Sequence, residues 1–514
     1  MTTSRNEPPG ADAAPADEAP EGEGAAPPSA GHAEQKEIDR RIMRGSAWIA
    51  LSYGGRQALT LISMLALVRI LDPKAFGLMA LATTMLLVLE AVHESGLASA
   101  LVYLRSDIER AAGTALVVSI LSSVVLYGAC FLVAPLLADV FHASTLTDVL
   151  RVLSLIVIFR AFAIVPGAIL ERELNFRGRG AAELLAAFLQ ATVAIGLALA
   201  GAGVWSLVVG NLVAAATTAL VVWLIIPWRP SPRKAQWGAL RQLWRYSWFM
   251  SGANILVLAN NTIDNVIVGR MLGAAQLGYY TVTYRVATMP DDVIGYIVGR
   301  VMFPVYSRLN EDKQEFGRVY VQNLQRIALL SLPASVGVIV AAEPIVLGLL
   351  GAKWLAVVTP LRILASYALV RAIVAPTGEV FKGAGKPYLL TAFSALHLSL
   401  STLCLLVLVP RYRLNGAAIG MLAPMVAVGV GVFIVGLRLL QVELPKVVRA
   451  LLPSYVCAGI LALALLALLP VAGTLSPAIG LVMLVAAGIC VYVASTAVFA
   501  RSVVVPMWAG LRRA

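Results

Sequence analysis

The sequence predicts an all-α integral membrane protein with about 14 transmembrane helices. Three observations support this fold class. Of the 514 residues, 59% are hydrophobic and 13% are charged, and the mean hydropathy is +0.84, which a soluble domain of this size could not cover with polar surface. Apolar runs long enough to cross a hydrocarbon core of about 30 Å recur along the chain, and an internal repeat relates its two halves.

The apolar runs begin near residue 46. Each is close to the roughly 20 residues that a helix needs to span a bilayer, and in lipid a helix satisfies its own backbone polar groups. The runs are 46–69, 76–96, 112–136, 149–170, 181–201, 204–226, 247–269, 278–303, 326–349, 356–378, 388–409, 415–437, 448–469 and 478–500. The first, second, seventh and eighth carry the most polar residues.

Charge follows the expected membrane topology. Residues 1–37 hold two basic and eight acidic residues, a net charge of −6 within a total of +12. In alternate connections Lys and Arg number 26 on one side and 6 on the other, so the positive-inside rule places both termini in the cytoplasm. Membrane topology explains the basic charge, and nucleic acid is not an expected partner. The four cysteines lie in apolar runs without a close pair, so neither a disulfide framework nor a metal site is expected.

The two halves of the chain match at an offset of 201 residues. Apolar composition alone is the competing explanation, but the matches include charged and small residues in register. They pair Arg44 with Arg245, Ser46 with Ser247, Arg69 with Arg270, Leu71 with Leu272, Gly77 with Gly278, Glu90 with Asp291 and Ser106 with Ser307. Six spans separate the copies, so the halves share one orientation, and two parallel six-helix lobes around a central cleft are expected, the plan of an alternating-access transporter.

This repeat sets the predicted domain boundaries. They are 1–37, a disordered acidic cytoplasmic tail; 38–226, an N-terminal lobe of spans one to six; 227–246, a cytoplasmic linker between the lobes; 247–440, a C-terminal lobe of spans seven to twelve; and 441–514, two extra helices with a short cytoplasmic tail.

Polar side chains share helix faces on spans one, two, seven and eight. A charge near the bilayer centre costs at least about 2.5 to 3.5 kcal/mol on insertion scales, so such groups should face the protein interior. On span one Ser52, Arg56 and Thr60 recur every four residues. The predicted substrate-binding residues are Arg56, Arg285, Ser52, Thr60, Asn254, Asn261, Asn265, Thr281, Thr288 and Tyr284.

Acidic residues on the same spans form the second predicted group. The residues predicted to act in gating or ion coupling are Glu90, Glu94, Asp264, Asp291 and Asp292. An internal ion pair of Arg56 or Arg285 with Glu90, Glu94 or Asp292 remains the alternative to substrate contact. Arg160, Arg362 and Arg371 are less well placed for contact with a substrate, and Arg69 and Arg270 end their spans, where snorkelling to the interface is the ordinary explanation.

Several segments carry a family resemblance. They are Leu67–Gly77, Gly96–Val102, Pro166–Arg177, Gly203–Leu207, Asp264–Tyr280 and Pro304–Leu309. In this order they resemble the bacterial polysaccharide (oligosaccharide-lipid) flippase family of the multidrug, oligosaccharidyl-lipid and polysaccharide exporter superfamily, and most closely its exopolysaccharide and lipopolysaccharide branch. Asp72 stands where a Gly usually precedes the Pro. The resemblance implies two six-helix lobes, with two additional helices in members of this length.

The resemblance also implies a function. The expected protein is a flippase of the bacterial inner membrane that translocates a polyprenyl-pyrophosphate-linked oligosaccharide repeat unit from the cytoplasmic to the periplasmic leaflet by alternating access, for exopolysaccharide or lipopolysaccharide biosynthesis. A multidrug or peptidoglycan-precursor exporter of the same superfamily is one alternative, and a membrane glycosyltransferase or polymerase is another.

The expected partners follow from this function. They are the lipid-linked oligosaccharide and the bilayer, with a polysaccharide polymerase and export machinery as candidates and proton or sodium coupling as an open alternative. The sequence has no phosphate loop, zinc-ligand spacing or nucleophile elbow, so neither a cofactor nor enzymatic activity is expected.

Overall fold

The computed structural model describes residues 48, 52, 54–93, 108–173, 175–227, 237–309 and 312–500. Within these ranges the regular secondary structure is helical, and a helix over 54–70 precedes the labelled elements. The elements are α2 Pro73–His93, α4 Ile108–Val140, α5 Thr145–Leu153, α6 Leu155–Arg172, α7 Phe176–Leu199, α8 Val204–Ile225, α9 Trp237–Arg308, α10 Lys313–Val340, α11 Ala342–Ile345, η2 Val346–Leu350, η3 Ala352–Val357, α12 Val358–Gly383, α13 Pro387–Leu440, α14 Leu444–Gly473 and α15 Pro477–Phe499.

The predicted all-α membrane fold is confirmed. In the part of the chain that the structure describes, 10 helices are long and apolar enough to cross a membrane, and the more polar α9 is not one of them. The number 14 therefore remains a prediction. The fourth predicted run starts inside α5, which is separated from α6 at Ser154. The predicted acidic tail, 1–37, lies outside the described residues, as do parts of the predicted linker and the end of the chain.

Two long helical segments reverse direction within their length. In α9 the backbone leaves helical geometry at Gly273 (φ 82°), and in α13 at Arg413 (φ 50°). The 16 residues from Asp264 to Tyr280 would cover about 24 Å in a straight helix, yet the Tyr280 hydroxyl donates to the Asp264 carboxylate at 2.8 Å. In α13 a Cβ atom on Gly420 would lie 2.9 Å from the side chain of Leu405, 15 residues earlier. Each of these segments therefore forms a helical hairpin.

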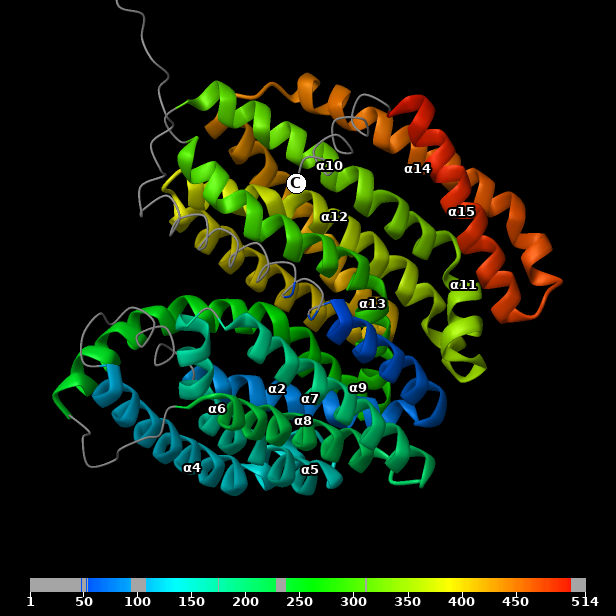
Figure 1. Ribbon diagram of the computed structural model, residues 1–514. Coiled ribbons are helices and arrows are strands. Elements are labelled where there is room, and N and C mark those ends of the chain that lie inside the picture. Colours follow the sequence, from blue (N-terminus) through cyan, green and yellow to red (C-terminus); the bar gives the residue numbers. More distant parts are fainter. Residues whose placement is uncertain are drawn as a thin grey trace, which may run out of the picture.

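The helices gather in two groups. We call residues 54–70, α2 and α4–α8 the first lobe, and α9–α13 the second lobe; Figure 1 shows α4–α8 together on one side and α10 and α12 on the other. In the second lobe α9 packs against α12 and α13, and across the molecule it packs against α2. Helices α14 and α15 lie on the outside of the second lobe (Figure 1). The predicted boundaries between the lobes remain predictions.

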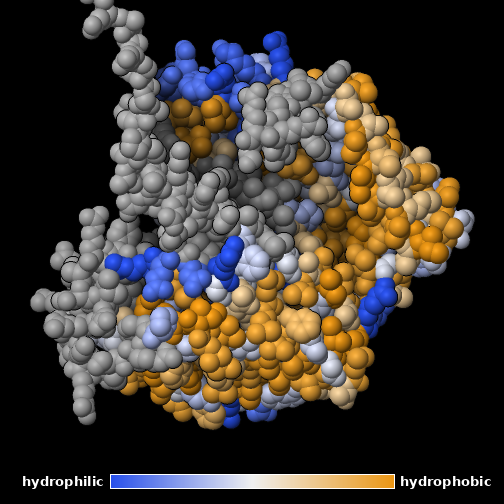
Figure 2. All heavy atoms as spheres, in the orientation of Figure 1, coloured by the Kyte–Doolittle hydropathy of each residue, from blue (hydrophilic) through white to orange (hydrophobic). Residues whose placement is uncertain are grey.

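On the face seen in Figure 2, apolar side chains cover the first lobe and the side of the molecule where α14 and α15 lie. Leu132 of α4 and Leu224 of α8, for example, are 76% and 74% exposed. Such a surface is stable against hydrocarbon and not against water.

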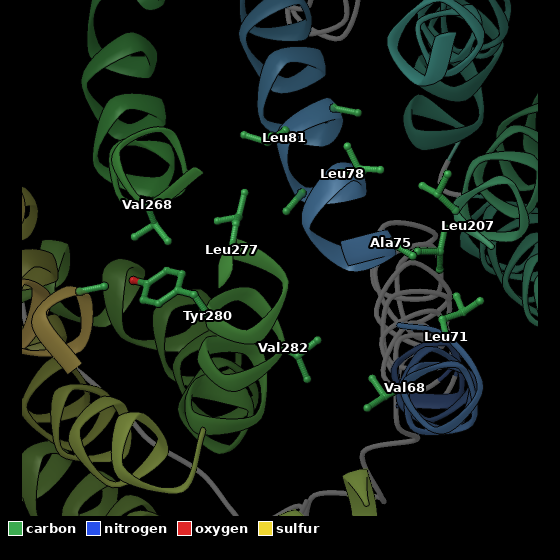
Figure 3. Close-up of a cluster of buried hydrophobic side chains, with 14 of the residues drawn as sticks. Val68, Leu71, Ala75, Leu78, Leu81, Leu207, Val268, Leu277, Tyr280 and Val282 are labelled. Carbon is green, nitrogen blue, oxygen red and sulfur yellow. The ribbon is translucent and has the colours of Figure 1, made fainter. Parts of the chain in front are cut away.

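The lobes meet in a reciprocal contact between α2 and α9. A Cβ atom on Gly77 would lie 1.6 Å from the carbonyl oxygen of Ala274, and one on Gly278 would lie 1.7 Å from that of Pro73. Gly77 therefore faces Ala274, and Gly278 faces Pro73. Residues 73 and 77 correspond to residues 274 and 278 at the offset of 201, so the two contacts are equivalent, as expected for halves related by a two-fold axis. Buried side chains surround this contact, among them Leu78 and Leu81 of α2 and Val268 and Leu277 of α9, which lie in one cluster (Figure 3).

Polar contacts close the same end of the molecule. The Arg69 guanidinium donates to the carbonyl oxygens of Gly348 and Leu349, and the Lys353 ammonium donates to those of Arg69 (3.0 Å) and Leu71 (2.7 Å). In the opposite sense, Arg270 of the second lobe contacts His142 of the first, at 3.5 Å. Arg69 and Arg270, equivalent in the repeat, thus each reach across to the other lobe.

Candidate functional site

A polar cavity of about 240 Å³ lies inside the first lobe. Its walls come from the helix at 54–70 and from α6, α7 and α8. The polar lining consists of Arg56, Thr60, Arg160, Glu183, Gln190, Asn211 and Thr218, and the remainder is Ile and Ala. Two guanidinium groups, two amides and two hydroxyls against one carboxylate make a cavity that suits an anionic, hydroxyl-rich group.

Arg160 connects this cavity to α2. Its guanidinium forms an ion pair with the buried carboxylate of Glu90, while 48% of the Arg160 side chain remains exposed. At the mouth of the cavity Glu183 is paired with Arg179 at 3.3 Å, on the same face of α7. The acids near the cavity are therefore both bound to arginines.

A second polar group runs along the inner side of the second lobe. It starts at Asp264, which is buried and accepts the hydrogen bond from Tyr280. The ring of Tyr284 lies 6.1 Å from that of Tyr280 and 6.0 Å from that of Tyr367 on α12. The Arg371 guanidinium follows, 5.9 Å from the Tyr367 ring centre, within the range of cation–π attraction.

Arg371 joins α12 to the second half of α9. It donates to Asp291 at 2.6 Å and to Asp292 at 2.5 Å, and the Thr288 hydroxyl also donates to Asp292, at 3.3 Å. Arg285 lies two helical turns before Asp292 on the same helix and is exposed. Arg285 is therefore open to a ligand, whereas Arg371 is fixed between two carboxylates.

The two lobes use one arrangement for their buried acids. Glu90 and Asp291, which match in the repeat, each pair with an arginine: Glu90 with Arg160 on α6, and Asp291 with Arg371 on α12. Each pair joins the second predicted span of its lobe to the fourth. A buried pair is worth less than its Coulomb energy, but losing one partner leaves a charge in a poorly solvated place.

The structure places the other predicted site residues in different surroundings. Arg56 and Thr60 line the first-lobe cavity, whereas Ser52 is buried behind them, donates to the carbonyl of Trp48 and packs against Gly180. Asn261 is exposed and Asn265 reaches Thr84 of α2 at 3.4 Å. The Thr281 hydroxyl bonds to the carbonyl of Leu277, on its own helix. The side chains of Asn254 and Glu94 lie outside the described residues.

The sequence pattern favours Arg56 and Arg285 over Arg160 and Arg371, and it does not single out the cavity residues Gln190, Asn211 and Thr218. The repeat held a usable signal, because an acid conserved between its halves inside the membrane requires a cationic partner in each lobe. Among the described residues no group of three His, Cys, Asp or Glu side chains could hold a metal ion.

Comparison with known proteins adds a family and relatives. Residues 66–359 match a family described as "Polysaccharide biosynthesis protein". A succinoglycan biosynthesis transport protein of Rhizobium meliloti is 27% identical over 315 residues, which cover 61% of this chain and 64% of that protein. A lipopolysaccharide biosynthesis protein of Escherichia coli is 24% identical over 355 residues, 67% of this chain and 70% of that protein. The chain thus spans just under two thirds of the length of the first of these relatives.

Solved structures share the fold. The lipid II flippase MurJ, in an inward closed conformation, superposes with a TM-score of 0.73 at 13% identity, over 89% of this chain and 99% of that one. An inward-facing multidrug resistance transporter of the MATE family, in the MOP superfamily, gives a TM-score of 0.61 at 16% identity, over 75% of this chain and 94% of that one. At such identities the likeness concerns the fold alone.

Proposed function

The chain belongs to the polysaccharide biosynthesis protein family, as its motifs predicted, and from this premise we propose that it is a flippase for a polyprenyl-pyrophosphate-linked oligosaccharide repeat unit. The unit would pass from the cytoplasmic to the periplasmic leaflet of the inner membrane and would supply exopolysaccharide or lipopolysaccharide synthesis. The names of the two relatives, a succinoglycan transport protein and a lipopolysaccharide biosynthesis protein, support this cargo class.

The observation that carries the proposal is the placement of guanidinium groups inside an apolar shell. Arg56 faces the first-lobe cavity and Arg285 is exposed on the second lobe. A guanidinium keeps its charge and offers planar paired donors that match a diphosphate. Amides, hydroxyls and tyrosine rings, including Asn261, Thr288 and Tyr284, suit the sugars. The protein would lower the cost of taking the charged head through hydrocarbon while the lipid tail stays in the bilayer.

The mechanism we propose is alternating access. The described lobes are joined at the end that carries residues 69–77 and 270–278. The predicted distribution of Lys and Arg assigns this end to the periplasm, so the cargo would enter from the cytoplasmic side. Opening of the joined end would release the head into the periplasm, and both termini would stay in the cytoplasm.

The described acids of the polar spans, of which Asp292 is exposed and the others are buried, are proposed to act in gating or coupling. Asp264, Asp291, Asp292 and Glu90 lie on helices that pack between the lobes or beside the cavity. A proton or sodium gradient is a suitable energy source for such carboxylates, since each elementary charge that crosses the membrane gains about 2.3 kcal/mol per 100 mV. A polymerase and export machinery would take up the product.

The same superfamily contains drug exporters, and the exposed arginine argues against that cargo. A pocket for cationic drugs needs accessible carboxylates, whereas in the second lobe Asp291 and Asp292 are bound to Arg371 and Asp264 accepts from Tyr280. Asp292 is also exposed, but its carboxylate is neutralised by Arg371, so Arg285 gives this wall an accessible positive charge. An anionic head is therefore the better match.

The direct test is translocation in reconstituted vesicles. Arg56→Ala with Arg285→Ala should abolish flipping of a fluorescent polyprenyl diphosphate-linked oligosaccharide, because one proposed guanidinium contact is removed in each lobe. Arg362→Ala is the matched control, since Arg362 is an exposed arginine of α12 that lies outside the first-lobe cavity. Unchanged flipping by the double variant at normal protein levels would refute the role of the two arginines, and no flipping by the wild-type protein would refute the function.

A further inference from the structure

The first-lobe cavity is too small for an oligosaccharide and large enough for its charged end. Its volume of about 240 Å³ lies below the ~300–1,000 Å³ of pockets that enclose a whole drug-sized ligand. We infer that this cavity is a diphosphate subsite within the first lobe, in which Arg56 and Arg160 hold the diphosphate and Glu90 competes for Arg160. This inference rests on the proposed function, which supplies the diphosphate.

The cavity wall carries both hydrogen-bond donors and acceptors. Arg56 and Arg160 come from different helices and bring fixed positive charge. The hydroxyl hydrogens of Thr60 and Thr218 are used on their own helices, where they bond to the carbonyls of Arg56 (2.8 Å) and Ala214 (2.9 Å). Their oxygens therefore remain as acceptors. The arginines suit phosphate oxygens, and the threonines suit hydroxyl groups such as those of the first sugar.

The amides extend the same pattern. Asn211 donates one amide hydrogen to the carbonyl of Leu207 at 2.8 Å, which leaves its second hydrogen and its carbonyl oxygen for a ligand. Gln190 lines the wall one helix away. Amides can serve both a phosphate oxygen and a hydroxyl, so they suit the junction between diphosphate and sugar.

Glu90 sets the strength of the subsite. Its carboxylate is buried and paired with Arg160, but nearly half of the Arg160 side chain is exposed, so the guanidinium can contact an anion while it stays near Glu90. A diphosphate must share Arg160 with this carboxylate and is repelled by it. Removal of the Glu90 charge should therefore strengthen binding, which is the opposite of what structural damage would do.

The test is calorimetric binding of inorganic pyrophosphate and of farnesyl diphosphate to the full chain in detergent. Both probes should bind the wild-type protein. Arg160→Gln should weaken both by about tenfold to a hundredfold, the range expected for hydrogen bonds to a charged group. Glu90→Gln should tighten both severalfold, and the control Arg362→Gln should leave both within about twofold, a difference that surface charges at a distance produce.

Other results would refute the subsite or the proposed function separately. Equal affinity of the wild-type protein and Arg160→Gln, or weaker binding by Glu90→Gln, would refute the subsite. If Arg160→Gln fails to fold, the affinity of Glu90→Gln still tests the subsite. Binding of pyrophosphate without farnesyl diphosphate would mean a site for free anions and would overturn the assignment to a lipid head. Flipping without diphosphate binding would remove only the subsite, whereas intact binding without flipping would remove the proposed function and keep the subsite.

Discussion

The contact between α2 and α9 gives a sharp test of how the lobes are held together. In Gly77→Ala the new methyl group would lie 1.6 Å from the carbonyl oxygen of Ala274, where an ordinary contact begins at 3.4 Å. The neighbouring atoms are backbone, so no side chain can turn away, and the two helices would have to separate by roughly 2 Å. Overpacking of this kind costs about 1 to 3 kcal/mol.

This free-energy cost destabilises the closed state, in which α2 and α9 are in contact. A change of about 1 to 3 kcal/mol shifts the ratio of closed to open protein by about 5- to 150-fold. Gly278→Ala should have the same effect, because its methyl group would lie 1.7 Å from the carbonyl of Pro73 in the equivalent contact. Gly196→Ala on α7 is the matched control, since nothing lies within 4 Å of a Cβ there and alanine is the better helix former.

The assay is the reaction of a buried thiol with a membrane-impermeant maleimide. The four native cysteines, which are all free, are replaced, and a single cysteine is placed at Val68, which is fully buried where the lobes meet. We expect faster labelling of this cysteine in Gly77→Ala and Gly278→Ala and no change in Gly196→Ala. A cysteine at Leu324, buried in the core of the second lobe, should stay unlabelled, which excludes general unfolding. Unchanged labelling at position 68 in both glycine variants would refute the reasoning.

Three further perturbations test the same structure. Arg371→Gln should lower the stability to thermal unfolding by about 3 kcal/mol, because it leaves two carboxylates without their partner; added Asp291→Asn should restore part of the loss, and an unchanged melting temperature would contradict the pairing. Tyr280→Phe removes the donor to buried Asp264 and should cost about 1 to 3 kcal/mol in denaturant unfolding, whereas Tyr388→Phe, an exposed tyrosine, should cost almost nothing; equal costs would argue against the bond. Lys353→Met removes two hydrogen bonds across the joined end and should speed labelling at position 68, whereas Lys382→Met, which is paired with Glu379 on α12, should not.

The fold could be predicted from composition because lipid leaves few choices. Apolar runs of sufficient length must be helices, and a repeat separated by an even number of spans must give parallel halves. The same reasoning found Arg56 and Thr60, which share a helix face and line one cavity. What it could not provide was the rotation of one helix against another. Gln190, Asn211 and Thr218 come from helices with no marked polar face, and only packing places them opposite Arg56.

The internal repeat also predicts that each lobe contains an internal ion pair. Glu90 and Asp291 match between the halves, and each needs a counter-charge within the membrane. The partners, Arg160 and Arg371, are 211 residues apart instead of 201, so they do not align in the repeat. The two arginines stand at different positions along equivalent helices, since Arg160 lies five residues after the start of α6 and Arg371 lies 13 residues after the start of α12. A matching acid therefore pairs in each lobe with an arginine that the repeat does not align.

The contacts within the lobes and the contacts between them differ in kind, and the difference bears on the proposed mechanism. Within the lobes, guanidinium groups pair with buried carboxylates, and loss of one partner of a fully buried pair costs about 3 to 5 kcal/mol. The cost is closer to this range for Arg371 with Asp291 than for Glu90 with Arg160, because 48% of the Arg160 side chain is exposed. Between them, the described bonds of Arg69 and Lys353 end on backbone carbonyls, which can exchange a protein donor for water at a net cost of about 1.5 to 3 kcal/mol. The four junction bonds can therefore be exchanged for water one at a time, whereas an ion pair inside a lobe is lost in a single step. Rigid lobes with a joint that opens stepwise are what alternating access requires, because a polar path can then change sides without exposing its charges to lipid.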